Sequence, residues 1–195
     1  KTKEFNYQNS FDKLSKEFSI NKGQKILLYV GSGFERKGVK EFLQIIFELR
    51  NLDIKAFVVG KEKNIEYYQQ LSKKLDIDRQ VIFAGARGDV DDFYTISDIF
   101  LFPTHYEPFS NVILEAMSFK NAVFTTKQNG ASEVLDDYFT MDSPNDSQVI
   151  SKINDLLQDQ VKLENIKKQN RMKSKRLSIE INLEKTLEVI NEVIS

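Results

Sequence analysis

The sequence is poor in the residues that hold metals and cross-link chains. It contains no cysteine and a single histidine. The absence of cysteine excludes disulfides and thiolate-based zinc sites, and it fits a reducing compartment. One histidine excludes a metal site built from several imidazoles.

Long apolar runs and net charge are also missing. No stretch is apolar for long enough to cross a bilayer. The 28 basic and 29 acidic residues leave a formal charge of −1, which gives no reason to expect nucleic acid or an anionic membrane as partner. The lysine-rich stretch 162–176 could suggest nucleic-acid binding, but Glu164 among its lysines favours a solvated helix face.

The chain is otherwise typical of one globular domain. Its 195 residues are enough for one domain or slightly more, and 41% hydrophobic with 29% charged residues predicts a sizeable core. The sequence begins with Lys1 and loop-like residues rather than Met. We therefore expect a fragment whose N-terminal part has been left out.

Short β-rich runs alternate with longer helical patterns. The runs are mostly continuous rather than alternating, which is typical of strands covered on both faces. They span 26–30, 54–60, 81–84, 98–102, 122–125 and 138–141. Helical spacing follows at 39–49, 65–75, 90–96 and 112–119. This order predicts an α/β fold with a doubly wound, mostly parallel, six-stranded Rossmann-like sheet.

Outside this alternation the pattern is helical only. Beyond residue 144 we expect helices over 145–157, 161–172 and 179–194, and a short helix over 11–18 precedes the first strand. In a sheet of order 3-2-1-4-5-6, ligands bind where strands 1 and 4 diverge at their carboxyl ends. The loops after these two strands, 31–38 and 103–110, are therefore the places to look for chemistry.

The first loop combines glycines with adjacent cations. Gly31, Gly33 and Gly38 let backbone approach a ligand, and Arg36 with Lys37 can neutralise a diphosphate. A glycine-rich turn with solvated charges is the alternative for this loop taken alone. The spacing matches neither a Walker A loop nor GxGxxG.

The second loop leads into a helix flanked by two carboxylates. Glu107 precedes the helix, Glu115 lies inside it, and Ser110 is a natural N-cap between them. A helix start favours phosphate, and carboxylates bind hydroxyls, so a sugar nucleotide suits both features. Each glutamate taken singly is more simply a surface charge. The buried helix turn between them, 112–114, weakens that alternative.

Three further features have simpler explanations. The run 89–92 is similar to the acidic motif of metal-dependent sugar transferases, but it opens a helix, where acidic residues suit the macrodipole. His105 lies beside the site as a candidate general base, although a lone histidine is more often structural. Asn129-Gly130 signals a turn that can bring Gly130 near a donor sugar.

Four motifs occur in the order typical of one enzyme family. They are 29–31 with 36–38, then 83–85, then Glu107-x7-Glu115-Ala116-Met117, then 129–133. Over roughly residues 24–135 the chain resembles the C-terminal half of retaining glycosyltransferases of family 4, the group 1 transferases of the GT-B fold. The first loop resembles that of bacterial lipopolysaccharide-core glucosyltransferases.

The resemblance implies roles for the site residues. Glu107 would lie by the donor sugar as the catalytic-site carboxylate, and Glu115 would hold the ribose hydroxyls. The diphosphate would meet Lys37, Arg36 and the backbone N–H groups of the helix start (Ser110, Asn111, Val112). Residues 85–87, including Arg87, would border the nucleobase, and Gly31, Gly33 and Gly130 would line the donor pocket.

The resemblance also implies a reaction. A hexose or N-acetylhexosamine would move from a nucleoside diphosphate sugar, most commonly of UDP, to a glycan or lipid-linked acceptor with retention of configuration. No cofactor and no metal would be needed, and nucleic acid would not be a partner. The enzyme would be cytoplasmic, with peripheral attachment to the inner face of the cytoplasmic membrane through the missing N-terminal domain.

The expected division of the chain follows from the same likeness. Residues 1–20 would enter from the missing domain, 21–172 would form the donor-binding domain, and 173–195 would cross back. The fragment alone would transfer little or no sugar. Departures from the family pattern are Ser32 in the first loop, where many members carry an arginine that Arg36 would replace, and Pro108 and Ser110 in the second loop, which leave its stiffness open. A sugar-nucleotide 2-epimerase or phosphorylase-like enzyme, or a non-catalytic α/β domain, stays an alternative.

Overall fold

Six parallel strands form the centre of the molecule. The computed structural model describes residues 6–177, so the helix predicted over 179–194 lies outside the described residues. The strands are β1 (Lys25–Val30), β2 (Ile54–Val59), β3 (Val81–Gly85), β4 (Ile99–Phe102), β5 (Ala122–Thr126) and β6 (Thr140–Met141). Their order, β3-β2-β1-β4-β5-β6, confirms the doubly wound prediction.

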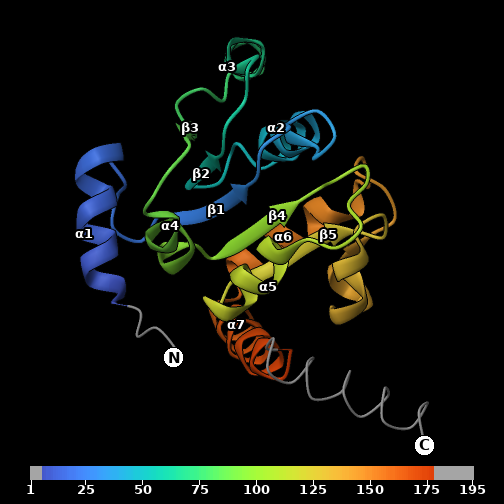
Figure 1. Cartoon of the computed structure of the whole chain (residues 1–195). Helices are drawn as coiled ribbons and strands as arrows, with labels where there is room; N and C mark the ends of the chain where they lie inside the picture. The colour runs from blue at the N-terminus through green and yellow to red at the C-terminus, as the bar shows by residue number, and fades with distance from the viewer. Residues whose placement is uncertain (1–5, 178–195) are drawn as a thin grey trace, which may run out of the picture.

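Helices cover both faces of this sheet (Figure 1). One side carries α2 (Val39–Glu48), α3 (Ile65–Lys74) and α6 (Gln148–Gln158), and the other carries α1 (Tyr7–Phe18), α4 (Val90–Ile96), α5 (Asn111–Ser118) and α7 (Gln160–Lys175). Burial on both faces explains why the strand sequences are continuous apolar runs. In β4 all four residues are buried.

The ends of the predicted elements differ in three places. The last strand is reduced to Thr140–Met141, because the preceding Asp137–Phe139 forms a short 3₁₀ turn. Helix α1 begins at Tyr7 rather than at residue 11, and its N-cap Asn6 accepts a hydrogen bond from the Asn9 amide. Helix α7 continues to Lys175, beyond the expected domain boundary at 172, and that boundary stays a prediction.

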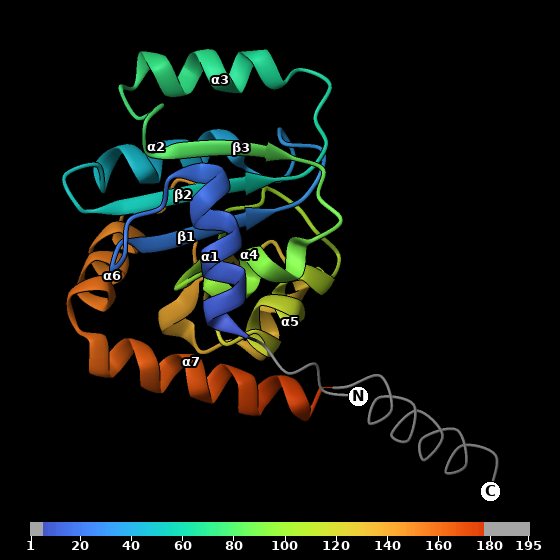
Figure 2. The ribbon, with the colours of Figure 1, turned by 90° about the vertical axis from the view of Figure 1, so that its left-hand side faces the viewer.

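Helix α1 is fastened to the sheet domain. It lies against α4, which Figure 2 shows side by side with it. The ring of Phe18 packs edge-on to the ring of Phe57, with centroids 5.3 Å apart. Its centroid lies 5.9 Å from that of the Phe93 ring. Helix α1 thus contributes to the core of the domain, and the role of residues 1–20 as an entry segment stays a prediction.

Candidate donor-binding site at the carboxyl ends of the strands

The two predicted loops meet through glycine. Gly38 has φ of 77°, and a Cβ built on it would lie 1.8 Å from the carbonyl oxygen of Pro103. Gly60, at the end of β2, would likewise place a Cβ 1.9 Å from the oxygen of Gly31. Only glycine permits these contacts, so the site has a floor of bare backbone.

The second loop is held from β5. The Glu107 amide donates to the carbonyl of Gln128 at 3.0 Å, and the Gly130 amide donates to that of Glu107 at 2.9 Å. A Cβ on Gly130 would lie 2.0 Å from the oxygen of Pro108. Gly130 therefore supports the Glu107 loop by close backbone contact, and its place beside a donor sugar stays a prediction.

Buried polar side chains complete this support. The Thr126 hydroxyl donates to the carbonyl of Thr104, and the Thr125 hydroxyl donates to that of Phe102. Asn129 is fully buried and donates to the hydroxyl of Thr125. Thr125 and Thr126 were missed at the sequence level, where Asn129 was named only as part of a turn. A polar cluster at the end of an apolar strand is the signal that points to them.

Two cations share one carboxylate oxygen at the mouth of the crevice. Arg36 Nη1 lies 3.2 Å and Lys37 Nζ 3.4 Å from Glu107 Oε2. Arg36 also donates to the carbonyl of Tyr106 at 2.6 Å. The structure thus brings the two predicted cations and the predicted glutamate together, with more positive than negative charge.

The second carboxylate stands one turn into α5. Glu115 is exposed, and its Oε2 accepts a hydrogen bond of 3.1 Å from the hydroxyl of Tyr94. Ser110 occupies the predicted N-cap position, but its side chain makes no capping hydrogen bond. The predicted N-cap position is thus confirmed, and the Ser110 residue is buried.

The start of α5 still presents backbone donors. The Ile113 amide donates to the carbonyl of Ser110 and closes the first turn. The amides of Ser110, Asn111 and Val112 precede that bond, where a helix cannot supply carbonyl partners. They lie between the two glutamates in sequence, as predicted.

Arg87 turns toward α1. Its guanidinium contacts Glu17 at 2.6 Å and Asp89 at 2.8 Å, and it lies over the rings of Phe18 and Phe93. Hydrogen bonds from Arg87 and, to a smaller extent, from Lys13 hold the pKa of the Asp89 carboxyl well below its usual range. Arg87 as a border of the nucleobase stays a prediction, and its side chain already has two anionic partners.

The acidic run 89–92 is used structurally. Asp92 accepts from Ser10 and Lys13 of α1, and Asp89 contacts the same lysine. Within residues 6–177 no group of three or more histidine, cysteine, aspartate or glutamate side chains is placed to hold a metal ion. The charges thus join α1 to the start of α4.

His105 lies on the outer side of the crevice. Its Nε2 is 3.3 Å from Glu41 Oε1, and Glu41 is 7% exposed in the first turn of α2. A hollow of about 390 Å³ beside it is lined by Glu35, Arg36 and His105. The His105–Glu41 contact joins the second loop to α2 and was not visible from the sequence.

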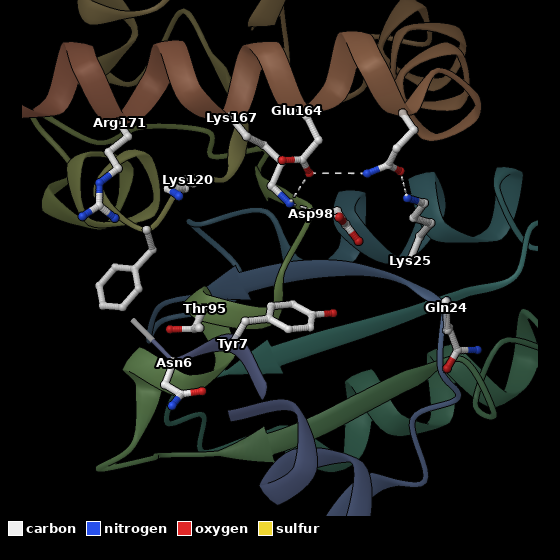
Figure 3. Close-up of a pocket in the computed structure, with 13 residues that line it drawn as sticks. Asn6, Tyr7, Gln24, Lys25, Thr95, Asp98, Lys120, Glu164, Lys167 and Arg171 are labelled. Carbon is white, nitrogen blue, oxygen red and sulfur yellow. Dashed lines mark hydrogen bonds and ion pairs between the residues drawn. The ribbon is translucent and has the colours of Figure 1, made fainter. Parts of the chain in front are cut away.

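A hollow of about 980 Å³ lies elsewhere (Figure 3). It runs between α1 and α7, where the strands begin rather than end. Its ions pair with one another, since Lys167 contacts Asp98 at 3.2 Å and Glu164 at 3.3 Å. None of the predicted donor-site residues lines it.

A parallel sheet with this strand order and a glycine-floored crevice at the carboxyl ends of its strands defines a Rossmann-like α/β domain. The family model described as Glycosyl transferases group 1 matches residues 10–174. The chain belongs to this family.

Known relatives agree with that assignment. Lipopolysaccharide 1,2-N-acetylglucosaminetransferase of Salmonella typhimurium is 32% identical over 168 residues, 78% of this chain and 44% of that protein. The crystal structure of WaaG, a glycosyltransferase involved in lipopolysaccharide biosynthesis, has a TM-score of 0.76 and 26% identity over 86% of this chain and 47% of that one.

A further solved structure of similar fold carries a nucleotide. The structure of Anabaena Alr3699/HepE in complex with UDP and glucose has a TM-score of 0.81 and 19% identity, over 94% of this chain and 52% of that one. The chain thus spans about half or less of these proteins and forms one half of a GT-B fold. Within residues 6–177, each helix is too short or too polar to span a bilayer.

Proposed function

We propose that this chain is the donor-binding half of a retaining glycosyltransferase. It binds a nucleoside diphosphate sugar, with UDP as the nucleotide and a hexose or N-acetylhexosamine as the sugar. The acceptor is a glycan or a lipid-linked sugar bound by a second domain. Relatives that act in lipopolysaccharide synthesis and a neighbour that carries UDP support this choice.

One observation carries the proposal. Arg36 and Lys37 meet Glu107 on one side of the start of α5, and Glu115 stands on the other side. Cations and free backbone amides suit a diphosphate, whereas carboxylates accept hydrogen bonds from sugar hydroxyls. The sequence order Glu107, amides, Glu115 then runs from donor sugar through diphosphate to ribose.

The chemistry follows from charge. As the bond to the sugar breaks, negative charge builds up on the departing diphosphate. Lys37, Arg36 and the α5 amides stabilise this charge in place, so neither a metal ion nor a cofactor is required. Glu107 binds hydroxyls of the transferred sugar and orients its anomeric carbon. Attachment to the inner face of the cytoplasmic membrane, if the whole protein has it, belongs to the second domain.

Calorimetry with UDP, GDP, ADP and their sugars tests the proposal. We expect UDP and a UDP-sugar to bind, and Glu115→Ala to weaken this binding about tenfold or more, as for loss of hydrogen bonds to a charged group. Glu48→Ala, an exposed glutamate late in α2, is the matched control and should bind normally. Absence of binding by all of these nucleotides would refute the proposal.

Transfer needs the second domain. We expect the 195-residue chain to bind donor yet to turn over little or no sugar, because the acceptor site lies elsewhere. Release of UDP in the presence of acceptor glycan is the measurement. Turnover by this chain as fast as by a two-domain enzyme would contradict the proposed division.

A further inference from the structure

The hydroxyl of Tyr94 meets one oxygen of Glu115. Tyr94 lies in α4, Glu115 in α5, and the two side chains join at 3.1 Å. Tyr94 is 1% exposed, whereas Glu115 is exposed. A buried tyrosine hydroxyl needs a hydrogen-bond partner, yet an exposed carboxylate has water. The contact therefore restricts Glu115, which would otherwise be free to move.

The tyrosine ring is fixed from several sides. It stacks on Phe119 with centroids 5.4 Å apart and lies 5.8 Å from the ring of Phe100. The backbone carbonyl of Tyr94 accepts a hydrogen bond of 2.9 Å from the buried amide of Asn121. Position and direction of the hydroxyl are thus set by the core.

The hydroxyl also keeps its proton. Burial, and then the negative charge of Glu115, raises the pKa of Tyr94 well above its usual range. The hydroxyl is therefore a hydrogen-bond donor to Glu115 at neutral pH. A carboxylate has about four lone-pair sites on its two oxygens. One site on Glu115 accepts from Tyr94, so the others stay available to a ligand.

We propose that Tyr94 is a positioning residue for nucleotide binding: by holding Glu115 Oε2, it presents the rest of the carboxylate to the two ribose hydroxyls. This inference rests on the proposed function, because it requires Glu115 to bind ribose. A vicinal diol needs two acceptor sites in one orientation. A carboxylate that rotates freely loses entropy when it binds such a pair, and a fixed one loses less.

Tyr94→Phe tests the proposal without emptying the core. The ring stays between Phe119 and Phe100, and only the hydroxyl is lost. By calorimetry we expect UDP affinity to fall about five- to tenfold, as for the loss of one charge-assisted hydrogen bond. The affinity for 2′,3′-dideoxy-UDP should not change. A merely structural tyrosine would weaken both ligands equally, and that result would overturn the proposal.

Two further variants complete the design. Tyr138→Phe removes a hydroxyl that donates to the Lys152 carbonyl at 3.4 Å, outside the crevice, and should leave UDP affinity unchanged. In a Glu115→Ala background, Tyr94→Phe should have no further effect on UDP binding, since nothing remains to be positioned. Equal losses in both backgrounds would overturn the proposal.

The outcomes separate the two levels of inference. If the unaltered chain binds no nucleotide, the proposed function fails and the role of Tyr94 fails with it. If it binds UDP and Tyr94→Phe binds as tightly, only the role of Tyr94 fails. If Tyr94→Phe does not fold, 4-amino-phenylalanine at position 94 retains a donor and should retain UDP affinity, whereas a loss of affinity there would contradict the proposal.

Discussion

The two ends of the parallel strands differ in how their charged side chains are paired. At the groove between α1 and α7, Lys167 is shared by Asp98 and Glu164, and Asp98 also accepts from the amide of Ile26. At the carboxyl ends of the strands, Arg36 and Lys37 share the single carboxylate of Glu107. The groove is larger, about 980 Å³ against about 390 Å³ for the hollow beside Arg36.

The difference teaches that volume does not identify the site. In the groove Lys167, Asp98 and Glu164 already pair with one another, so these ions hold α7 against the start of β4. At the carboxyl ends of the strands, Arg36 and Lys37 converge on the single carboxylate of Glu107 beside a floor of backbone. The groove is thus expected to govern stability and the crevice to govern binding, and three changes test this contrast.

Gly38→Ala should have the largest effect, because it strikes both properties at once. The new Cβ would collide with the Pro103 carbonyl at 1.8 Å, on a backbone with φ of 77°. We expect a loss of about 2–4 kcal/mol in the free energy of unfolding, together with loss of UDP binding. Gly88→Ala is the control, since a Cβ there has no atom within 4 Å. Denaturant melts measure the stability of both variants. Equal stability would contradict the close contact assigned to Gly38.

Replacing one lysine at each end of the strands separates an effect on UDP affinity from an effect on the free energy of unfolding. Lys37→Met should lower UDP affinity about tenfold or more through loss of a phosphate contact, with little change in unfolding. Lys167→Met should leave UDP affinity unchanged and destabilise by about 1–2 kcal/mol, because Asp98 loses a half-buried partner. Calorimetry and denaturant melts on both variants check this, and the reverse pattern would exchange the roles of the two ends.

The smallest expected effect is a loss of stability in acid that arises from Glu62, beside the first loop. The backbone amides of Asn64 and Phe34 hold the pKa of this carboxyl below its usual value of 4.5. A lowered pKa in the folded state contributes stability above the unfolded value, and that contribution is lost as pH falls through the folded one. Glu62→Gln should therefore lower stability slightly at pH 7 and flatten its decline below pH 4.5. An unchanged pH profile would show that Glu62 does not stabilise the first loop.

The fold was largely predictable from the sequence. Strands buried on both faces must be apolar throughout, and β1, β2 and β4 show this directly. The order of such strands also places the loops 31–38 and 103–110 at one crevice. The end of the sheet was less predictable, because a strand as short as Thr140–Met141 leaves almost no pattern.

The supports of the site were not predictable in the same way. Tyr94 lies in an apolar helical pattern that indicates core, and its partner Glu115 is 21 positions away. His105 and Glu41 likewise meet only because the second loop folds against α2. For Ser110, residue type predicted the N-cap position correctly but did not reveal that its side chain makes no capping hydrogen bond. Local propensity places residues, and tertiary contacts decide what they do.

The glycines at the ends of neighbouring strands set limits on redesign. A library that randomises this edge should recover only glycine at position 60, because any side chain there meets the oxygen of Gly31 at 1.9 Å. Position 88, with open space around it, should accept many residues. Altered donor selectivity would then be reached through the loop after β3, while the backbone floor is inherited unchanged.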